Sequence, residues 1–141
     1  MKIAIGCDHG GLELKKVIIS FLEKNNYEYK DFGTYNSDSV DYPLIAKEVA
    51  NNVADGNFER GILICGSGLG VAITANKVKG IRAVTCHDTY SARMSRAHNN
   101  ANILTMGARV IGPDLACDVV KIWLETNFEG GRHQKRVDMI E

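Results

Sequence analysis

The chain has 141 residues, a length typical of one domain, and we expect residues 1–141 to form one. Its 17 basic and 17 acidic side chains cancel, which argues against nonspecific nucleic-acid binding because that requires a positive surplus. No apolar run approaches the roughly 20 residues of a membrane helix and no secretion signal is visible, so we expect no membrane association and a cytoplasmic protein with reduced cysteines.

The first half of the chain alternates short apolar runs with longer amphipathic runs. Residues 3–5 are typical of a short strand, and residues 12–24 carry apolar side chains at helical spacing. Residues 27–32 alternate as a strand does. Asp41-Tyr42-Pro43 indicates a helix start, where the missing proline N–H costs little, and the helix is expected to run to residue 56.

The second half continues the alternation. Residues 61–65 form the most apolar run and predict a central strand, followed by a short helix over 69–77. A strand over 81–86, a helix opened by His87 or Asp88, a strand over 102–106 and a helix over 113–125 come next. The order predicts a doubly wound α/β domain, Rossmann-like or flavodoxin-like, with a five-stranded parallel sheet and helices on both faces.

Reactive side chains follow four of the five predicted strands. They are Cys7, Asp8 and His9 after the first, Cys65 after the third, Cys86, His87 and Asp88 after the fourth, and Arg109 after the fifth. Ligands of open parallel sheets bind outside the carboxyl ends of the strands. The sequence therefore predicts a site at this end of the sheet.

The sharpest local signal is the turn Cys65-Gly66-Ser67-Gly68-Leu69-Gly70. Its glycines permit a tight turn and expose backbone amides, which form an anion site together with the helix N-terminus that follows. The same field favours the thiolate form of Cys65. A thiolate beside such amides suits the removal of a proton and the binding of the resulting oxyanion. A buried cysteine that merely ends a strand explains the turn equally well.

Four other candidates each have two interpretations. Asp8 suits a sugar hydroxyl or caps the first helix, and His98 is a reactive group or a solvated histidine favoured by the dipole at a helix end. Arg132 and Arg136 are four residues apart, so on a helix they would share a face that suits a phosphate, or they belong to a solvated basic tail. No pair of histidines has metal-ligand spacing, so no metal is expected.

Together these residues resemble the ribose-5-phosphate isomerase B family over nearly the whole chain. The segments that carry the resemblance are Gly6-Cys7-Asp8-His9, Asp41-Tyr42-Pro43, residues 61–70, Ala75-Asn76-Lys77, Gly80-Ile81-Arg82-Ala83, His98-Asn99 and residues 129–133. The resemblance implies an aldose–ketose isomerase that interconverts ribose 5-phosphate and ribulose 5-phosphate through a cis-enediolate, without a cofactor.

The resemblance also implies roles for individual residues. Cys65 would take the proton from C2, and His98, aided by Asp8, would open the sugar ring. Gly66, Ser67, Gly68, Leu69 and Gly70 would hold the enediolate through their amides, and His9, Tyr42, Asn99, Arg109, Arg132 and Arg136 would bind the substrate. The family's other branch uses a glutamate as the base, but residues 71–77 contain no acidic side chain. Ser67 stands where threonine is common and keeps the hydroxyl.

His98 and Asn99 precede the fifth strand, so within one chain they should lie at the opposite end of the sheet from Cys65. Family members are commonly homodimers with shared sites, and we therefore expect a homodimer whose active sites are completed across the interface.

Two rival functions remain open on the sequence. A hexose 6-phosphate such as allose or galactose 6-phosphate would use the same catalytic set. A nucleotide- or phosphate-binding regulatory module would share the fold but would not need Cys65 and His98. A redox role is disfavoured because Cys65 has no resolving cysteine nearby in the sequence.

Overall fold

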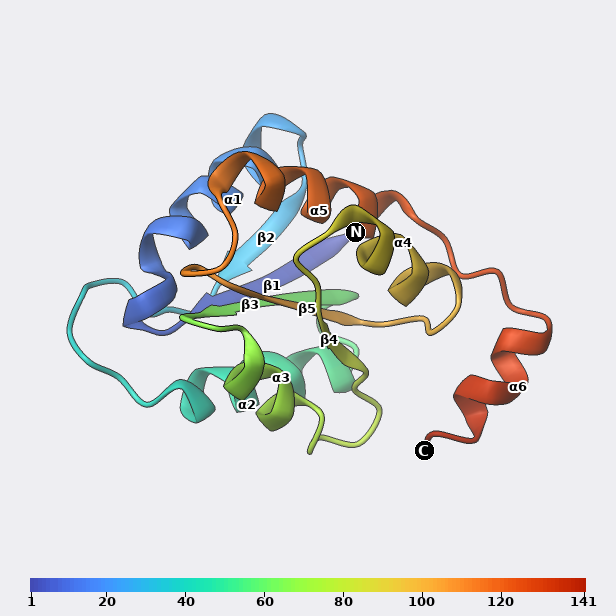
Figure 1. The fold of residues 1–141 in the computed structure, drawn as a ribbon. Coiled ribbons are helices and arrows are strands. Elements are labelled where there is room, and N and C mark those ends of the chain that lie inside the picture. The colour runs from blue at the N-terminus through green and yellow to red at the C-terminus, as the bar shows by residue number, and fades with distance from the viewer.

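Five parallel strands form a single sheet in the order β2-β1-β3-β5-β4 in the computed structural model, which describes residues 1–141 (Figure 1). The strands are β1 (Lys2–Cys7), β2 (Glu28–Asp31), β3 (Arg60–Cys65), β4 (Ala83–Thr85) and β5 (Ile103–Gly107). Every residue of β3 is buried, as expected for a central strand. The predicted α/β class with a five-stranded parallel sheet is confirmed.

Helices cover both faces of the sheet. Figure 1 shows α1 (Leu12–Lys24), α4 (Thr89–Ala97) and α5 (Pro113–Glu125) on one face, and α2 (Tyr42–Ala54) and α3 (Leu69–Ala75) on the other. A short 3-10 helix, η1 (His9–Gly11), precedes α1, and α6 (Arg132–Asp138) stands apart from the two layers. None of these helices is both long and apolar enough to cross a membrane.

The alternation of β3 divides the core into two layers. Ile62 and Ile64 belong to the cluster that contains Trp123 of α5, whereas Leu63 and Cys65 belong to the cluster under α2 and α3. This follows from the two-residue period of a strand, which sends successive side chains to opposite faces. Cys65 is thus anchored in the core at the point where β3 ends.

Several segments differ in their bounds from the sequence prediction, and two of the differences concern α3 and β4. Helix α3 ends at Ala75 rather than at residue 77, and β4 has three residues instead of the six expected over 81–86. The N–H of Ile81 donates to the carbonyl of Val78 at 3.1 Å and the N–H of Arg82 to the side chain of Asn102 at 2.8 Å, so a turn precedes β4. Asn76 binds the free edge of β4, where its side-chain amide donates to the carbonyl of Ala83 at 2.9 Å and accepts from the Ala83 N–H at 2.7 Å.

An ion pair with a buried lysine joins α1 to the end of β2. The side chain of Lys15 is only 2% exposed, and its Nζ lies 2.7 Å from the carboxylate of Asp31. The same Nζ donates to the carbonyl of Thr34. A buried ammonium requires such partners because an isolated charge is costly outside water.

Candidate active site

The turn after β3 encloses the thiol of Cys65. The backbone N–H of Gly68 donates to the Cys65 sulfur at 3.1 Å, and the side chain is 6% exposed. Gly68 has φ of +79°, and a Cβ there would lie 2.7 Å from the carbonyl carbon of Met106. Only glycine suits this position, because both the left-handed backbone and the close approach to β5 exclude a side chain.

Two threonine hydroxyls hold the turn against the sheet. Thr105 of β5 donates to the carbonyl of Gly68 at 2.7 Å, and Thr85 of β4 lies 3.2 Å from the same oxygen. The two hydroxyls are themselves 2.8 Å apart, as the direct pairing of these residues in the two strands allows. The glycine turn is therefore fixed to two strands.

The amides predicted to hold an anion fall into two groups. That of Gly68 points to the Cys65 sulfur, and that of Leu69 donates to the hydroxyl of Ser67 at 3.2 Å. The amides of Gly66, Ser67 and Gly70 have no hydrogen-bond partner within the chain. Those of Gly66 and Ser67 precede α3 and are available to an oxyanion.

A pocket of about 450 Å³ opens beside this turn. It brings together Asp8 from the end of β1, Tyr42 from the start of α2 and Arg109 after β5, with Cys65, Gly66, Ser67, Gly70 and Val110. Asp8 is buried and its carboxylate accepts from the N–H of Gly10 at 2.9 Å. Asp8 thus caps the first helical turn, as one of its two interpretations predicted, and it also lines the pocket.

His9 lies in a neighbouring hollow of about 330 Å³ that shares Arg109 with the Cys65 pocket. Its Nδ1 accepts from the N–H of Val40 at 3.2 Å. His87 accepts from the N–H of Gly107 at 2.8 Å through Nε2 and joins the segment after β4 to the end of β5. Asp88 caps α4 by accepting from the N–H of Ser91 at 2.6 Å.

The second half of the predicted set lies at the other end of the sheet. His98 ends α4 and is followed by the exposed Asn99, before β5 begins at Ile103, whereas Cys65 pairs with Gly107 where β5 ends. Four residue steps along β5 correspond to about 13 Å. His98 therefore lies outside the Cys65 pocket of the same chain, in agreement with the placement expected from the sequence.

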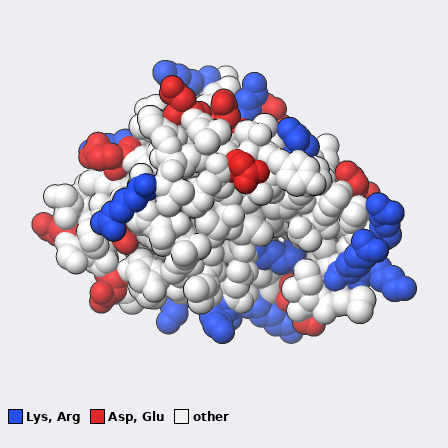
Figure 2. Space-filling view, in the orientation of Figure 1, with Lys and Arg blue, Asp and Glu red and all other residues white.

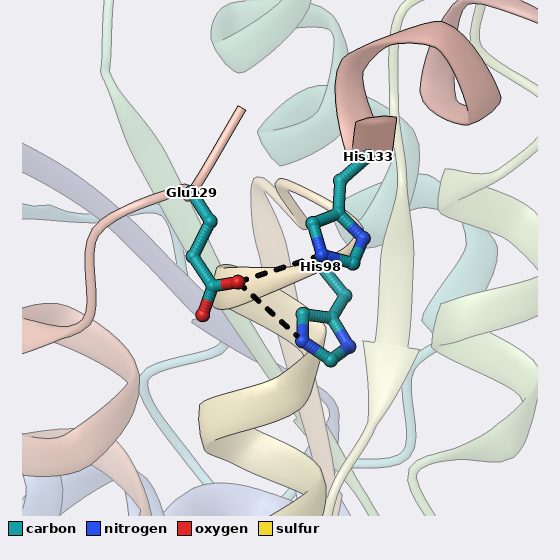
Figure 3. Close-up of side chains that lie close together, drawn as sticks. All are labelled: His98, Glu129 and His133. Carbon is teal, nitrogen blue, oxygen red and sulfur yellow. Dashed lines mark ion pairs between the residues drawn. The ribbon is translucent and has the colours of Figure 1, made fainter. Parts of the chain in front are cut away.

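His98 has two close neighbours for which the sequence indicated no role. Its ring stacks on that of His133 with centroids 4.1 Å apart and planes within 9° (Figure 3). The carboxylate of Glu129 lies 3.7 Å from Nε2 of His98 and 3.4 Å from Nε2 of His133. Burial, and then the neighbouring His98, lower the pKa of His133. In the sequence, the four-residue spacing of Glu129 and His133 was the signal that could have indicated their proximity.

Arg132 and Arg136 lie on α6, so the helical face predicted for them is present. Both are exposed and neither has an acidic partner. Figure 2 shows basic side chains gathered where α6 lies in Figure 1. Two neighbouring guanidinium groups without an acidic partner suit the binding of a phosphate.

The remaining cysteines differ from Cys65. Burial raises the pKa of Cys7 and of Cys86 to about 11, so both remain thiols near neutral pH. Burial also raises the pKa of Cys117 in α5. Neither Cys7 nor Cys86 lines a pocket. Cys65 is thus the one cysteine in the candidate site.

Comparison with known proteins gives a consistent result over the whole chain. A model of the Ribose/Galactose Isomerase family matches residues 3–140. A Listeria innocua protein named ribose-5-P isomerase B is 53% identical, covering 100% of this chain and 95% of the relative. A solved ribose-5-phosphate isomerase B from Clostridium thermocellum is 57% identical with a TM-score of 0.98, covering 99% and 95%. A Mycoplasma genitalium ribose-5-phosphate isomerase B with bound ribulose-5-phosphate is 41% identical with a TM-score of 0.95, covering 99% and 93%.

Proposed function

The chain belongs to the ribose/galactose isomerase family, and we propose that it interconverts D-ribose 5-phosphate and D-ribulose 5-phosphate at the pocket around Cys65. The observation that carries the proposal is a thiol enclosed by a glycine turn whose amides at Gly66 and Ser67 are free. The names of the similar proteins favour the pentose over allose or galactose 6-phosphate. One of them was solved with ribulose-5-phosphate bound.

The proposed reaction moves one proton at carbon. Cys65 as thiolate takes the proton from C2 of the open-chain aldose, the C–H electron pair becomes the C1–C2 double bond, and the carbonyl pair moves onto O1. The free amides of Gly66 and Ser67 stabilise the charge that develops on oxygen in this enediolate. The O2 hydroxyl proton moves to O1, the O2–H electron pair forms the C2 ketone, and the C1–C2 double-bond pair takes the proton back from Cys65 at C1. Substrate and product are isomers, so the reaction needs no external oxidant or reductant.

The ring-opening and phosphate-binding groups are proposed to come from a second copy of the chain. His98, Asn99, Arg132 and Arg136 are distant from Cys65 in their own chain because they belong to the amino end of β5 and to α6. We propose a homodimer in which His98 of the partner subunit faces Cys65, with Arg109 and the arginines of α6 on the phosphate.

Exposed apolar side chains support this association. More than half of the surface is exposed for Leu44 of α2, for Leu69 and Ile73 of α3, and for Met139 and Ile140 after α6. Leu69 and Ile73 lie four residues apart on α3 and so share a helix face, and adjacent exposed apolar side chains mark interaction surfaces. The four cysteines are unpaired, which accords with a cytoplasmic enzyme.

The test is an assay of ketose formation from ribose 5-phosphate in the presence of a metal chelator, with allose 6-phosphate as the alternative substrate. We expect turnover of the pentose, loss of activity by at least about a thousandfold in Cys65→Ala, and no change in the matched variant Cys117→Ala. Turnover of the hexose alone would retain the mechanism and change the substrate. No turnover of either sugar by a folded protein would contradict the isomerase.

A further inference from the structure

Three side chains at the amino end of the sheet converge on one point, and the proposed reaction uses only His98 among them. His98 ends α4, Glu129 lies in the segment between α5 and α6, and His133 is in the first turn of α6 (Figure 3). The backbone N–H of Glu129 donates to the carbonyl of Ala97 at 3.0 Å. This bond fixes the segment against the end of α4, so the cluster is held by the backbone.

The two distances from the carboxylate to the imidazoles are closer to the spacing of metal ligands than to a hydrogen bond. The Nε2 atoms of His98 and His133 lie 3.7 and 3.4 Å from the same carboxylate oxygen, longer than the roughly 2.7–3.2 Å of an N–H···O bond. Neighbouring ligand atoms around tetrahedral zinc are about 3.3–3.5 Å apart, given bonds of about 2.0–2.2 Å. The three ligand atoms all lie within 4.8 Å of one another.

We propose that His98, Glu129 and His133 form a binding site for zinc or a similar divalent transition ion, and that the bound ion inhibits the isomerase. Two imidazoles and one carboxylate are a ligand set that zinc uses with its fourth position open. The stacked rings must turn out of parallel so that each lone pair is directed at the ion. His98 has room to turn because its side chain is 40% exposed.

Inhibition follows from the proposed function and rests on it, whereas metal binding does not. His98 of the partner subunit is proposed to open the sugar ring at Cys65 by exchanging a proton through its imidazole. An imidazole nitrogen that ligates a metal has no lone pair left for a proton. Activity is therefore expected to fall in proportion to occupancy of the site and to return when a chelator removes the ion.

Metal binding is tested first, by titrating metal-free protein with Co²⁺ as a spectroscopic substitute for zinc and with Zn²⁺ in a calorimeter. We expect one ion per chain, visible cobalt bands without the near-ultraviolet absorption of a cobalt–thiolate bond, and at least about tenfold weaker binding in Glu129→Gln. The matched variant is Glu125→Gln, an exposed glutamate at the end of α5, which should bind as the wild type does. Should Glu129→Gln not fold, His133→Gln replaces it in the same comparison.

Inhibition is tested second, as the ratio of ketose formation with and without zinc. We expect zinc to inhibit the wild type and Glu125→Gln. At the same zinc concentration, Glu129→Gln should keep the rate that it has without metal. The absence of binding, equal binding by Glu129→Gln, or a cobalt–thiolate band would overturn the site. Binding at the site that leaves the rate unchanged would overturn the inhibition. A protein without isomerase activity would still bind the ion, so failure of the proposed function is distinguishable from failure of the site.

Discussion

A mixture of two inactive variants should regain activity if each active site draws on two subunits. Cys65→Ala removes the proposed base, and His98→Asn removes the group proposed to open the ring. In a mixed dimer, one site carries both substitutions and the other carries neither. Random exchange of equal amounts makes half of the dimers mixed, each with one intact site of two, so the mixture should recover about a quarter of the wild-type rate.

The structure sets this expectation because β5 separates the two residues. Cys65 pairs with the last residue of β5, and His98 lies before its first residue. The strand alone accounts for about 13 Å, far beyond the hydrogen-bond distance at which a side chain exchanges a proton.

The assay is ketose formation from ribose 5-phosphate after the subunits have exchanged, with each variant alone as the baseline. A second mixture gives an independent measure of whether the sites are shared. Wild type mixed equally with the double variant Cys65→Ala/His98→Asn should keep about a quarter of the rate if sites are shared and about half if each site lies in one chain. No recovery in the first mixture together with one half in the second would refute the shared site.

Three further predictions concern single features of the chain. Gly68→Ala should destabilise the protein by at least about 2 kcal/mol in denaturant unfolding, because φ is positive and the added methyl meets the β5 backbone. An alkylating reagent at pH 8 should modify Cys65 while Cys7, whose pKa of about 11 keeps it a thiol, reacts only as the pH approaches that value; mass spectrometry of the peptides decides. Lys15→Met should destabilise the protein by about 2 kcal/mol, because Asp31, whose side chain is 25% exposed, loses its cation. The same change at the exposed neighbour Lys16 should cost less than about 1 kcal/mol in the same unfolding measurement.

The elements were predictable because the apolar periodicity that marks them is local. The side chains of residues 61–65 are apolar on both faces, which predicted a strand buried on both sides. The glycines that follow predicted a tight turn, and that turn packs on the neighbouring strand. The rule that ligands bind at the carboxyl ends of parallel strands was then enough to group Cys65 with Arg109, and the two residues do line one pocket.

What the sequence could not supply depends on contacts between distant segments. The convergence of Glu129 and His133 on His98 requires the path of the chain after α5, which has no periodic signal. The hydroxyl contacts of Thr85 and Thr105 depend on β4 and β5 pairing in that register. The shortened β4 follows from a turn in which the N–H of Ile81 donates to the carbonyl of Val78, a contact that apolar periodicity does not reveal.

The place of β5 inside the sheet also constrains how the chain folds. Strand β4 pairs only with β5, although β4 comes earlier in the chain, and β5 is bounded on its other side by β3. During synthesis, a chain that has emerged only as far as α4 holds a β2-β1-β3 sheet with an open edge and has no strand against which β4 can pair. When residues 103–107 emerge, β5 can pair with the open edge of β3, and β4 can then pair with β5. The contacts of Thr85 and Thr105 with the Gly68 turn therefore depend on a non-local pairing that forms late in synthesis.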